Sequence, residues 1–237
     1  MEQTKNTLRA LACAGFGYAL GEINPAYLQG MRKGYDIRKK GTGNAGATNT
    51  MLLEGKLAGA FVMLFDIGKA AVSVSLCRKL FPKYRSAGEL AGTSAILGHM
   101  FPAAMGFRGG KGLACIGGTI LALGDFPVML GFAAAVLAKT RYLCAVPISA
   151  SVFYPVYHGL ISGNWQGAAI LGTVAFPVFA KHTENLRRIS EGRELKIDFV
   201  WDREGELKRT GLEEQAEKID RGEIPDKVIL PPMPKTE

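Results

Sequence analysis

Long apolar stretches alternate with short polar segments along most of this chain. The apolar stretches cover about residues 7–28, 57–80, 88–105, 112–124, 126–139, 142–161 and 166–181. A straight transmembrane helix needs about 20 residues, and shorter or broken helices are tolerated inside a helix bundle. We therefore predict an all-α polytopic membrane protein with about seven transmembrane helices, some of them short. The fourth and fifth stretches form either one long helix or two short helices that meet at Asp125.

Three polar, glycine-rich patches interrupt the apolar stretches. They are residues 41–49 (Gly-Thr-Gly-Asn-Ala-Gly-Ala-Thr-Asn), residues 98–112 (which include Gly-His-Met-Phe-Pro and Arg-Gly-Gly-Lys-Gly) and residues 182–185 (His-Thr-Glu-Asn). Seven spans place all three patches at one face of the bilayer, whereas six spans would move the third patch to the other face. Glycines let backbone N–H groups converge on an anion, and the start of a following helix attracts negative charge. The pattern therefore indicates a site for an anionic, phosphate-bearing substrate beside the lipid.

The charge pattern separates an apolar, basic region from a highly charged C-terminal segment. Residues 1–180 carry 17 Lys and Arg against 7 Asp and Glu, whereas residues 181–237 carry 12 against 14. Loops on the patch side hold ten basic residues before the C-terminal segment, and loops on the opposite side hold six. The positive-inside rule therefore places the N-terminus outside and the patches in the cytoplasm. Basic residues in short loops fit this topology better than nucleic-acid binding, which we do not expect.

The chain divides into a membrane domain over residues 1–196 and a charged cytoplasmic extension over residues 197–237. The extension has the pattern of a short amphipathic helix over about 202–221, and we expect its Pro-rich end to be extended or disordered. The first apolar stretch contains Glu22 and Asn24 and lacks a clear small-residue cleavage site. We therefore expect no cleavable signal peptide.

Two glycine patterns match nucleotide-binding motifs only in part. Residues 41–46 read Gly-x-Gly-x-x-Gly, but a charged loop precedes them instead of a strand, so we reject a dinucleotide site. Residues 108–112 do not complete a P-loop, because Ala104 stands where its first glycine belongs and Gly112 stands where Ser or Thr is required. Each pattern alone also fits a plain loop.

Several polar side chains interrupt or border the apolar stretches. Asp66 and Lys69 lie three residues apart, as a structural intrahelical pair or as groups that face a polar interior. His182 and Asn185 lie one helical turn apart, whereas we expect His158, in an apolar run, to be structural. The scattered histidines suggest no metal site. We expect the cysteines to act as small hydrophobic residues; they are Cys13, Cys77, Cys115 and Cys144.

Taken together, the motifs resemble the acyl-phosphate-dependent glycerol-3-phosphate acyltransferase family of bacterial membrane enzymes. In chain order they are Asp36-Ile37-Arg38 leading into Gly43-Asn44-x-Gly46-Ala47-Thr48-Asn49, Asp66-x-x-Lys69, Gly98-His99-x-Phe101-Pro102, Gly109-Gly110-Lys111-Gly112, Thr140-Arg141-Tyr142, and His182-x-x-Asn185 with Glu194. Each motif is weak alone, but the ordered set, over about residues 10–196, is specific. The family has seven spans with its motifs on the cytoplasmic side, in agreement with the topology above.

The resemblance implies transfer of a fatty acyl group from acyl phosphate to the 1-hydroxyl of glycerol 3-phosphate at the bacterial inner membrane. The products would be lysophosphatidic acid and phosphate, with no metal, cofactor or acyl-CoA. The loop at residues 109–112 would bind the phosphate of glycerol 3-phosphate, the loop at residues 42–49 would serve acyl phosphate and catalysis, and Glu194 would be structural. The implied catalytic residues are Thr42, Asn44, His182 and Asn185. The implied substrate-binding residues are Lys40, Gly43, Gly46, Thr48, Asn49, Asp66, Lys69, His99, Arg108, Gly109, Gly110, Lys111, Gly112 and Arg141. Either His182 or a substrate phosphate oxygen would act as the base for the hydroxyl.

The chain also departs from the family pattern. Thr42 and Cys144 stand where Ser is usual, and Glu22 and Asn24 alter a Gly-Ser-Ile-Pro segment. Leu52 replaces an arginine, and the loss of a phosphate-binding arginine is the most serious change. Either another cation compensates, or the acyl donor or acceptor differs. A transporter of an anionic solute with a midplane site and a scaffold without catalysis are the alternatives. The candidate compensating cations are Lys40, Lys56 and Arg78.

Overall fold

The computed structural model describes residues 2–200 and 202–210 and the single positions 214, 217, 218, 221 and 223. Throughout this part of the chain, the regular elements are helices, which confirms the all-α prediction. The α-helices are α1 (Glu2–Glu22), α2 (Pro25–Arg32), α3 (Ala47–Glu54), α4 (Lys56–Leu80), α5 (Ala87–Met100), α6 (Leu113–Leu123), α7 (Phe126–Thr140), α8 (Ala145–Ser162), α9 (Trp165–Gly172), α10 (Ala175–Ser190) and α11 (Arg203–Thr210). Three 3-10 turns join them, at η1 (Ile37–Lys39), η2 (Ala103–Met105) and η3 (Ile197–Val200).

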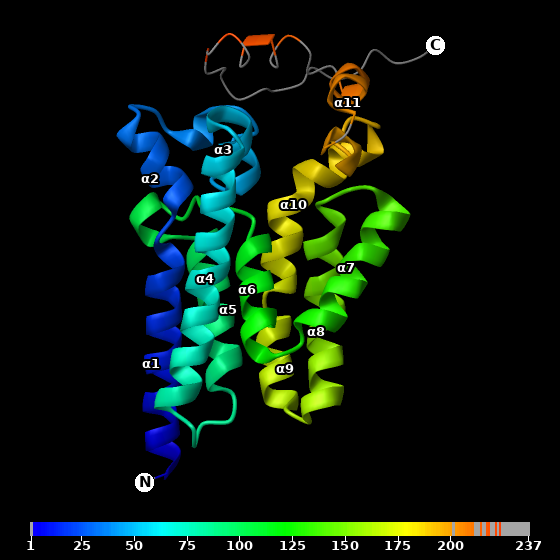
Figure 1. Ribbon diagram of the computed structural model, residues 1–237. Helices are drawn as coiled ribbons and strands as arrows, with labels where there is room; N and C mark the ends of the chain where they lie inside the picture. Colours follow the sequence, from blue (N-terminus) through cyan, green and yellow to red (C-terminus); the bar gives the residue numbers. More distant parts are fainter. Residues whose placement is uncertain are drawn as a thin grey trace.

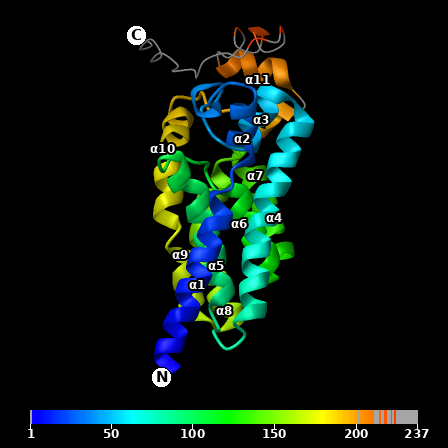
Figure 2. The same cartoon turned by 90° about the vertical axis from the view of Figure 1, so that its left-hand side faces the viewer.

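The long helices stand side by side and alternate in direction (Figure 1). α1 starts at the end marked N, and the short helices α2 and α3 lie at the opposite end, with α11 (Figures 1 and 2). We call this opposite end the patch end, because the chain segments after α1, α5 and α10 all lie there. The predicted gathering of the polar patches at one end of the bundle is therefore confirmed.

α1 and α5 pack closely because two glycines of α1 allow backbone contact. A Cβ atom added at Gly17 would lie 2.2 Å from the carbonyl oxygen of Ala91, and one at Gly21 would lie 2.3 Å from that of Ala95. Glycines four residues apart form one small-residue face of a helix, a common device for close helix contact in membranes. This contact fixes the end of α1 beside the end of α5, where the second patch begins.

Breaks between helices decide points that the apolar pattern left open. Gly124, with φ of +98°, ends α6, and Asp125 precedes α7, so two short helices replace the single long one. The seventh apolar stretch is divided between α9 and α10, and the first is divided between α1 and α2. Of the helix predicted over about 202–221, the structure describes α11 (Arg203–Thr210), and most positions beyond Thr210, including the Pro-rich end, lie outside the described residues.

Among the described residues, α4 is the one helix that is both long and apolar enough to cross a membrane, whereas α6 and α7 are apolar but shorter. Large apolar side chains nevertheless point outward from several helices of the bundle. Extended exposed apolar surface is unusual for a soluble monomer and typical of contact with a membrane or partner. The most exposed of these side chains include Leu57, Leu64, Leu160, Ile161 and Phe176.

A buried polar network lies toward the end of the bundle opposite the patches. His158 Nε2 lies 3.1 Å from Glu89 Oε1, and His158 Nδ1 lies 2.8 Å from Asp125 Oδ2. Tyr154 and Asn164 donate hydrogen bonds to the same two carboxylates. His158 is therefore held between two carboxylates of other elements, and its buried position fits the expected structural role.

Candidate active site

The first patch is shaped from within by Asn49, which is fully buried. Its Oδ1 accepts a hydrogen bond from the backbone N–H of Thr42 at 2.8 Å, and its Nδ2 donates to the carbonyl oxygens of Ile37 and Lys40 at 3.0 Å each. Both amide hydrogens of Asn49 are thus engaged by the loop. The side chains of Thr42 and Thr48, in contrast, are exposed at the patch end.

Asn24, which was outside the predicted set, attaches the first patch to its surroundings. Asn24 caps α2 by accepting from the N–H of Tyr27 at 2.9 Å, and its Nδ2 donates to the carbonyl oxygen of Ala45 at 3.1 Å. Asn24 therefore links the end of α1 to the first patch. The cap sequence Asn-Pro was the local signal for this role, because Asn is a favoured N-cap and Pro a favoured first helical residue.

Arg38 connects the first patch to the second. Its guanidinium donates to the carbonyl oxygens of Met105 at 2.7 Å and Arg108 at 3.2 Å, and it is held by the carboxylate of Asp36 at 2.8 Å. The hydrogen bonds from Arg38 lower the pKa of Asp36 below its usual value. Arg38 and Asp36 thus form a structural link, which explains a motif that the substrate assignment left without a role.

Asp66, Lys69 and His99 form a buried cluster beneath the patches. Lys69 Nζ lies 2.7 Å from Asp66 Oδ1 and 3.1 Å from His99 Nδ1, and it donates to the carbonyl oxygen of Ile23 at 2.7 Å. Both readings of Asp66 and Lys69 hold at once, because they form an intrahelical pair and face the bundle interior. A buried ion pair with further hydrogen bonds holds its members in one geometry.

The second patch closes over this cluster through Gly110. A Cβ atom added there would lie 2.1 Å from His99 Nε2 and 2.8 Å from the carbonyl oxygen of Ala45. The N–H of Gly110 also donates to the carbonyl oxygen of His99 at 3.1 Å. Only a residue without a side chain fits between the imidazole and the first patch, so Gly110 marks the point where the first two patches meet.

The third patch meets the second through a chain of charged and amide groups. Lys111 Nζ donates to Asn185 Oδ1 at 2.5 Å, and Asn185 Nδ2 donates to Glu194 Oε1 at 2.5 Å. Glu194 Oε2 also accepts from Arg188 Nε at 2.6 Å. Glu194 therefore holds Asn185 and Arg188 together, and its structural role stays a prediction. All three patches are thereby connected at one end of the bundle.

His182 lies on the same face of α10 as Asn185 and is buried. Its Nδ1 lies 2.8 Å from the carbonyl oxygen of Val178. Because a carbonyl oxygen only accepts hydrogen bonds, Nδ1 carries the proton in this contact. A neutral His182 would then have Nε2 as its basic atom, as a general base requires.

Cations surround the second patch at different depths. Burial, followed by the positive charge of Arg188, lowers the pKa of Lys111. Lys181 lies over the ring of Phe101, with 4.7 Å between its Nζ and the ring centroid, and donates to the carbonyl oxygen of Gly109 at 3.4 Å. Arg108 is exposed. These groups give the second patch a concentration of positive charge.

Two basic residues considered at the sequence level lie elsewhere or are engaged by other groups. Arg141 is exposed and forms an ion pair with Asp198 of the C-terminal segment. Arg78 donates to the carbonyl oxygen of Ala122 at the end of α4 that lies farthest from the patches. The suggestion that Arg78 compensates for Leu52 is therefore wrong, whereas Lys40 and Lys56 lie at the patch end.

Among the described residues, one group of side chains has the composition of a metal site. One ligand atom each from Asp66, His99 and Cys115 lie within 4.8 Å of one another. Lys69 already places a positive charge 2.7 Å from the Asp66 carboxylate. A metal ion would have to displace that ammonium group, so the cluster fits an ion-pair network better than a resident metal.

Comparison with known proteins agrees with this arrangement. The chain is 33% identical over 193 residues to the glycerol-3-phosphate acyltransferase of Symbiobacterium thermophilum, covering 79% of this chain and 94% of that relative. It is 36% identical over 204 residues to the enzyme of that name from Cereibacter sphaeroides, covering 83% and 94%.

Two solved structures share the fold. The crystal structure of PlsY, an integral membrane glycerol 3-phosphate acyltransferase, in its glycerol 3-phosphate form has a TM-score of 0.67 and 29% identity, covering 81% of this chain and 96% of that one. The lysophosphatidic acid form has a TM-score of 0.64. This likeness supports an integral membrane protein. The family model for glycerol-3-phosphate acyltransferase matches residues 11–192, and the chain belongs to that family.

Proposed function

We propose that this protein transfers a fatty acyl group from acyl phosphate to the 1-hydroxyl of sn-glycerol 3-phosphate, releasing lysophosphatidic acid and inorganic phosphate. The observation that carries the proposal is the convergence of the three patches: Gly110 against His99 and Ala45, and Lys111 against Asn185. A transporter with a midplane site would not require its polar motifs to gather at one end. The relatives named above are glycerol-3-phosphate acyltransferases, which supports glycerol 3-phosphate as the acceptor.

The second patch is proposed to bind the phosphate of glycerol 3-phosphate. Lys111 supplies a half-buried ammonium group, and exposed Arg108 supplies a guanidinium group near the surface. The glycines at 109, 110 and 112 add no side chains to the loop, while the N–H groups of Gly109 and Gly110 already donate to the carbonyl oxygens of Met100 and His99 at 3.1 Å each. Positive charge is needed here because both substrates are anionic and repel each other.

The first patch is proposed to hold acyl phosphate. Asn49 fixes the backbone of this loop from below, while Thr42 and Thr48 present hydroxyl groups at the surface. The side chain of Asn44 is suited to donate hydrogen bonds to the acyl carbonyl and the phosphate, whereas the N–H groups of Gly43 and Gly46 already donate to the carbonyl oxygens of Lys40 and Asn44 at 2.9 and 3.1 Å. Lys40 would contribute positive charge beside acyl phosphate in place of the family arginine that Leu52 replaces.

Acyl phosphate is an activated donor, so no enzyme nucleophile is required. The oxygen of the 1-hydroxyl attacks the acyl carbonyl carbon, and the bond between that carbon and the phosphate oxygen breaks. Inorganic phosphate leaves with the bonding electrons, and Nε2 of His182 accepts the hydroxyl proton. Negative charge on the carbonyl oxygen during this step is stabilised by oriented donors. Asn185 would hold Lys111 beside the base.

The proposed setting is a bacterial inner membrane, with the N-terminus outside and the patch end in the cytoplasm. Both substrates then reach the site from the side on which the basic loops lie. The exposed apolar side chains of the bundle would contact lipid, and the acyl chain of the donor would enter from the same apolar environment.

A panel of donors and acceptors tests this proposal and its nearest rival, a different substrate pair. The purified protein is given palmitoyl phosphate or palmitoyl-CoA, each with labelled glycerol 3-phosphate or glycerol, and products are separated by thin-layer chromatography. We expect lysophosphatidic acid from palmitoyl phosphate and glycerol 3-phosphate only. Product from another pair would refute the assignment, and a gain of activity in Leu52→Arg with glycerol 3-phosphate would identify Leu52 as the cause.

A further inference from the structure

We propose that the segment from Lys196 to Thr210, here called the C-terminal clasp, positions the phosphate-binding Lys111, with Arg209 as the positioning residue. The inference rests on the proposed function, because it assigns the clasp to the phosphate-binding half of the same site. The family model ends at residue 192, so the clasp lies beyond the part of the chain that it matches. α11, the helix of the clasp, lies above α10 at the patch end (Figure 1).

Arg209 fastens the clasp to the turn that follows α10. Its guanidinium donates to the carbonyl oxygen of Glu194 at 2.5 Å and to that of Gly192. Two further hydrogen bonds, at 2.7 and 2.8 Å, join it to the carboxylate of Glu206. A guanidinium that uses several donors at once is held in a fixed orientation. One residue of a charged segment thus binds two backbone carbonyls beside the candidate site.

Glu206 supports this geometry from a buried position. Only 5% of its surface is exposed, although α11 is rich in charged residues. In addition to Arg209, its carboxylate accepts from the backbone N–H of Lys196 at 2.9 Å. A buried carboxylate is costly unless it is fully paired. Glu206 thus joins α11 to Lys196, the first residue of the clasp, and holds Arg209 in place against the turn after α10.

The turn held by Arg209 carries Glu194 into the site. Gly192 has φ of +68°, which reverses the chain, and the N–H of Glu194 donates to the carbonyl oxygen of Arg188 at 3.1 Å. The Glu194 carboxylate then binds Asn185, and Asn185 binds Lys111. Three consecutive hydrogen bonds thus join Arg209 to the ammonium group of Lys111, through the backbone carbonyl and carboxylate of Glu194 and the side chain of Asn185.

A second attachment joins the clasp to the turn between α7 and α8. The N–H of Ile197 donates to the carbonyl oxygen of Arg141 at 2.7 Å, and Asp198 forms an ion pair with the Arg141 side chain. The clasp therefore contacts the C-terminal ends of both α7 and α10. This attachment explains why Arg141, a predicted substrate-binding residue, is engaged by the chain itself.

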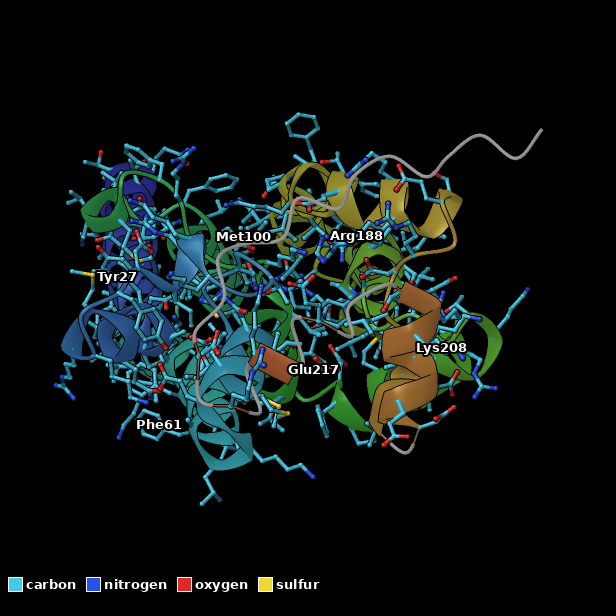
Figure 3. All side chains as sticks on the ribbon, turned by 90° about the horizontal axis from the view of Figure 1, so that it is seen from above. Tyr27, Phe61, Met100, Arg188, Lys208 and Glu217 are labelled. Atoms are coloured by element: carbon cyan, nitrogen blue, oxygen red, sulfur yellow. The ribbon has the colours of Figure 1, made fainter. Side chains whose placement is uncertain are left out.

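The test compares Arg209→Ala with Lys208→Ala, its neighbour on α11. Lys208 is exposed, and Figure 3 shows it on the outer side of the patch end, away from Arg188. Initial rates of lysophosphatidic acid formation are measured while glycerol 3-phosphate and palmitoyl phosphate are varied separately. We expect Arg209→Ala to raise KM for glycerol 3-phosphate about tenfold, because displacements below 1 Å already weaken positioning. KM for palmitoyl phosphate should change less than twofold, and Lys208→Ala should match the wild type.

Two further variants separate positioning from simple loss of folded protein. Arg209→Lys keeps the charge but not the forked donors, so it should recover only part of the lost affinity. Glu206→Gln weakens the ion pair that orients Arg209 but keeps the Arg209 side chain. This variant should raise KM for glycerol 3-phosphate by a smaller factor than Arg209→Ala does. A fall in kcat with both KM values unchanged would overturn the inference, since fewer folded molecules would produce that result.

The outcomes also separate this inference from the proposed function. An inactive wild-type protein would contradict the acyltransferase assignment and, with it, the role of the clasp. An active wild type with unchanged KM for glycerol 3-phosphate in both Arg209→Ala and Glu206→Gln would contradict the clasp alone.

Discussion

Substitution of Gly110 by alanine tests whether the contact between the first two patches is needed for activity. The new Cβ atom would lie 2.1 Å from His99 Nε2 and 2.8 Å from the carbonyl oxygen of Ala45. Ordinary non-bonded contact between heavy atoms begins at about 3.5 Å, so the loop and the imidazole would have to separate by about 1.4 Å. His99 has little freedom to move, because Lys69 and Asp66 lie against its other nitrogen.

The expected effect on activity follows from this displacement. A misplacement of about 1 Å costs about 100-fold in rate where catalysis depends on positioning. Overpacking a core costs about 1–3 kcal/mol, so the protein should still fold. We expect Gly110→Ala to lose about 100-fold in kcat/KM for glycerol 3-phosphate, with a modest fall in thermal stability.

Gly117→Ala is the matched control. Gly117 lies in α6, seven positions after Gly110 in the chain, and a Cβ atom added there meets no heavy atom within 4 Å. Alanine in a helix interior is about 0.5–1 kcal/mol more favourable than glycine, so this variant should be as active and at least as stable as the wild type. Activity of Gly110→Ala within twofold of wild type would refute the reasoning that the patches must meet at this point.

Two other predictions concern charge. Burial and the positive charge of Arg188 lower the pKa of Lys111, so the lysine loses its charge at a pH below the usual value of about 10.4. We therefore expect kcat/KM for glycerol 3-phosphate to fall as the pH rises into this range. Lys111→Arg keeps its charge there and should remove the fall from the profile of kcat/KM against pH. An alkaline limb unchanged in Lys111→Arg would contradict the assignment. Glu89→Ala should destabilise the protein by about 3–5 kcal/mol, because it leaves the buried His158 without one of its two carboxylates. Thermal unfolding should show this loss of stability, while KM for glycerol 3-phosphate stays constant. A changed KM would contradict the prediction, because it would show that the buried network around His158 affects substrate binding.

The sequence predicted the patches and their common end because these features are local. Apolar stretches mark helices, and glycine beside polar residues marks loops. Because the chain reverses direction at each loop, counting the helices between two motifs predicts whether the motifs lie at the same end of the bundle. The break at Gly124 was one of two predicted outcomes for the same reason. Family motifs then supplied the candidate roles of Lys111 and His182, which stay predictions until they are measured.

Contacts between distant residues could not be predicted from the sequence. Arg38 binds carbonyl oxygens that lie 67 and 70 positions away, and Glu89 meets His158 at a separation of 69. Backbone carbonyls carry no side-chain signature, and a histidine in an apolar run gives no sign of its partner on another helix. The clasp was hidden similarly: a charged helix suggested solvent, whereas two of its residues, Glu206 and Thr210, are buried.

The most direct test of the central claim is the formation of lysophosphatidic acid from palmitoyl phosphate and labelled glycerol 3-phosphate by the wild type, Lys111→Ala and His182→Ala. These variants alter the second and third patches separately, and each protein is checked first for correct folding in detergent. We predict product from the wild type and a loss of at least about 100-fold in each variant, since each removes a charge or a base used in the transition state. Full activity in both folded variants would contradict the claim that the converging patches form the active site.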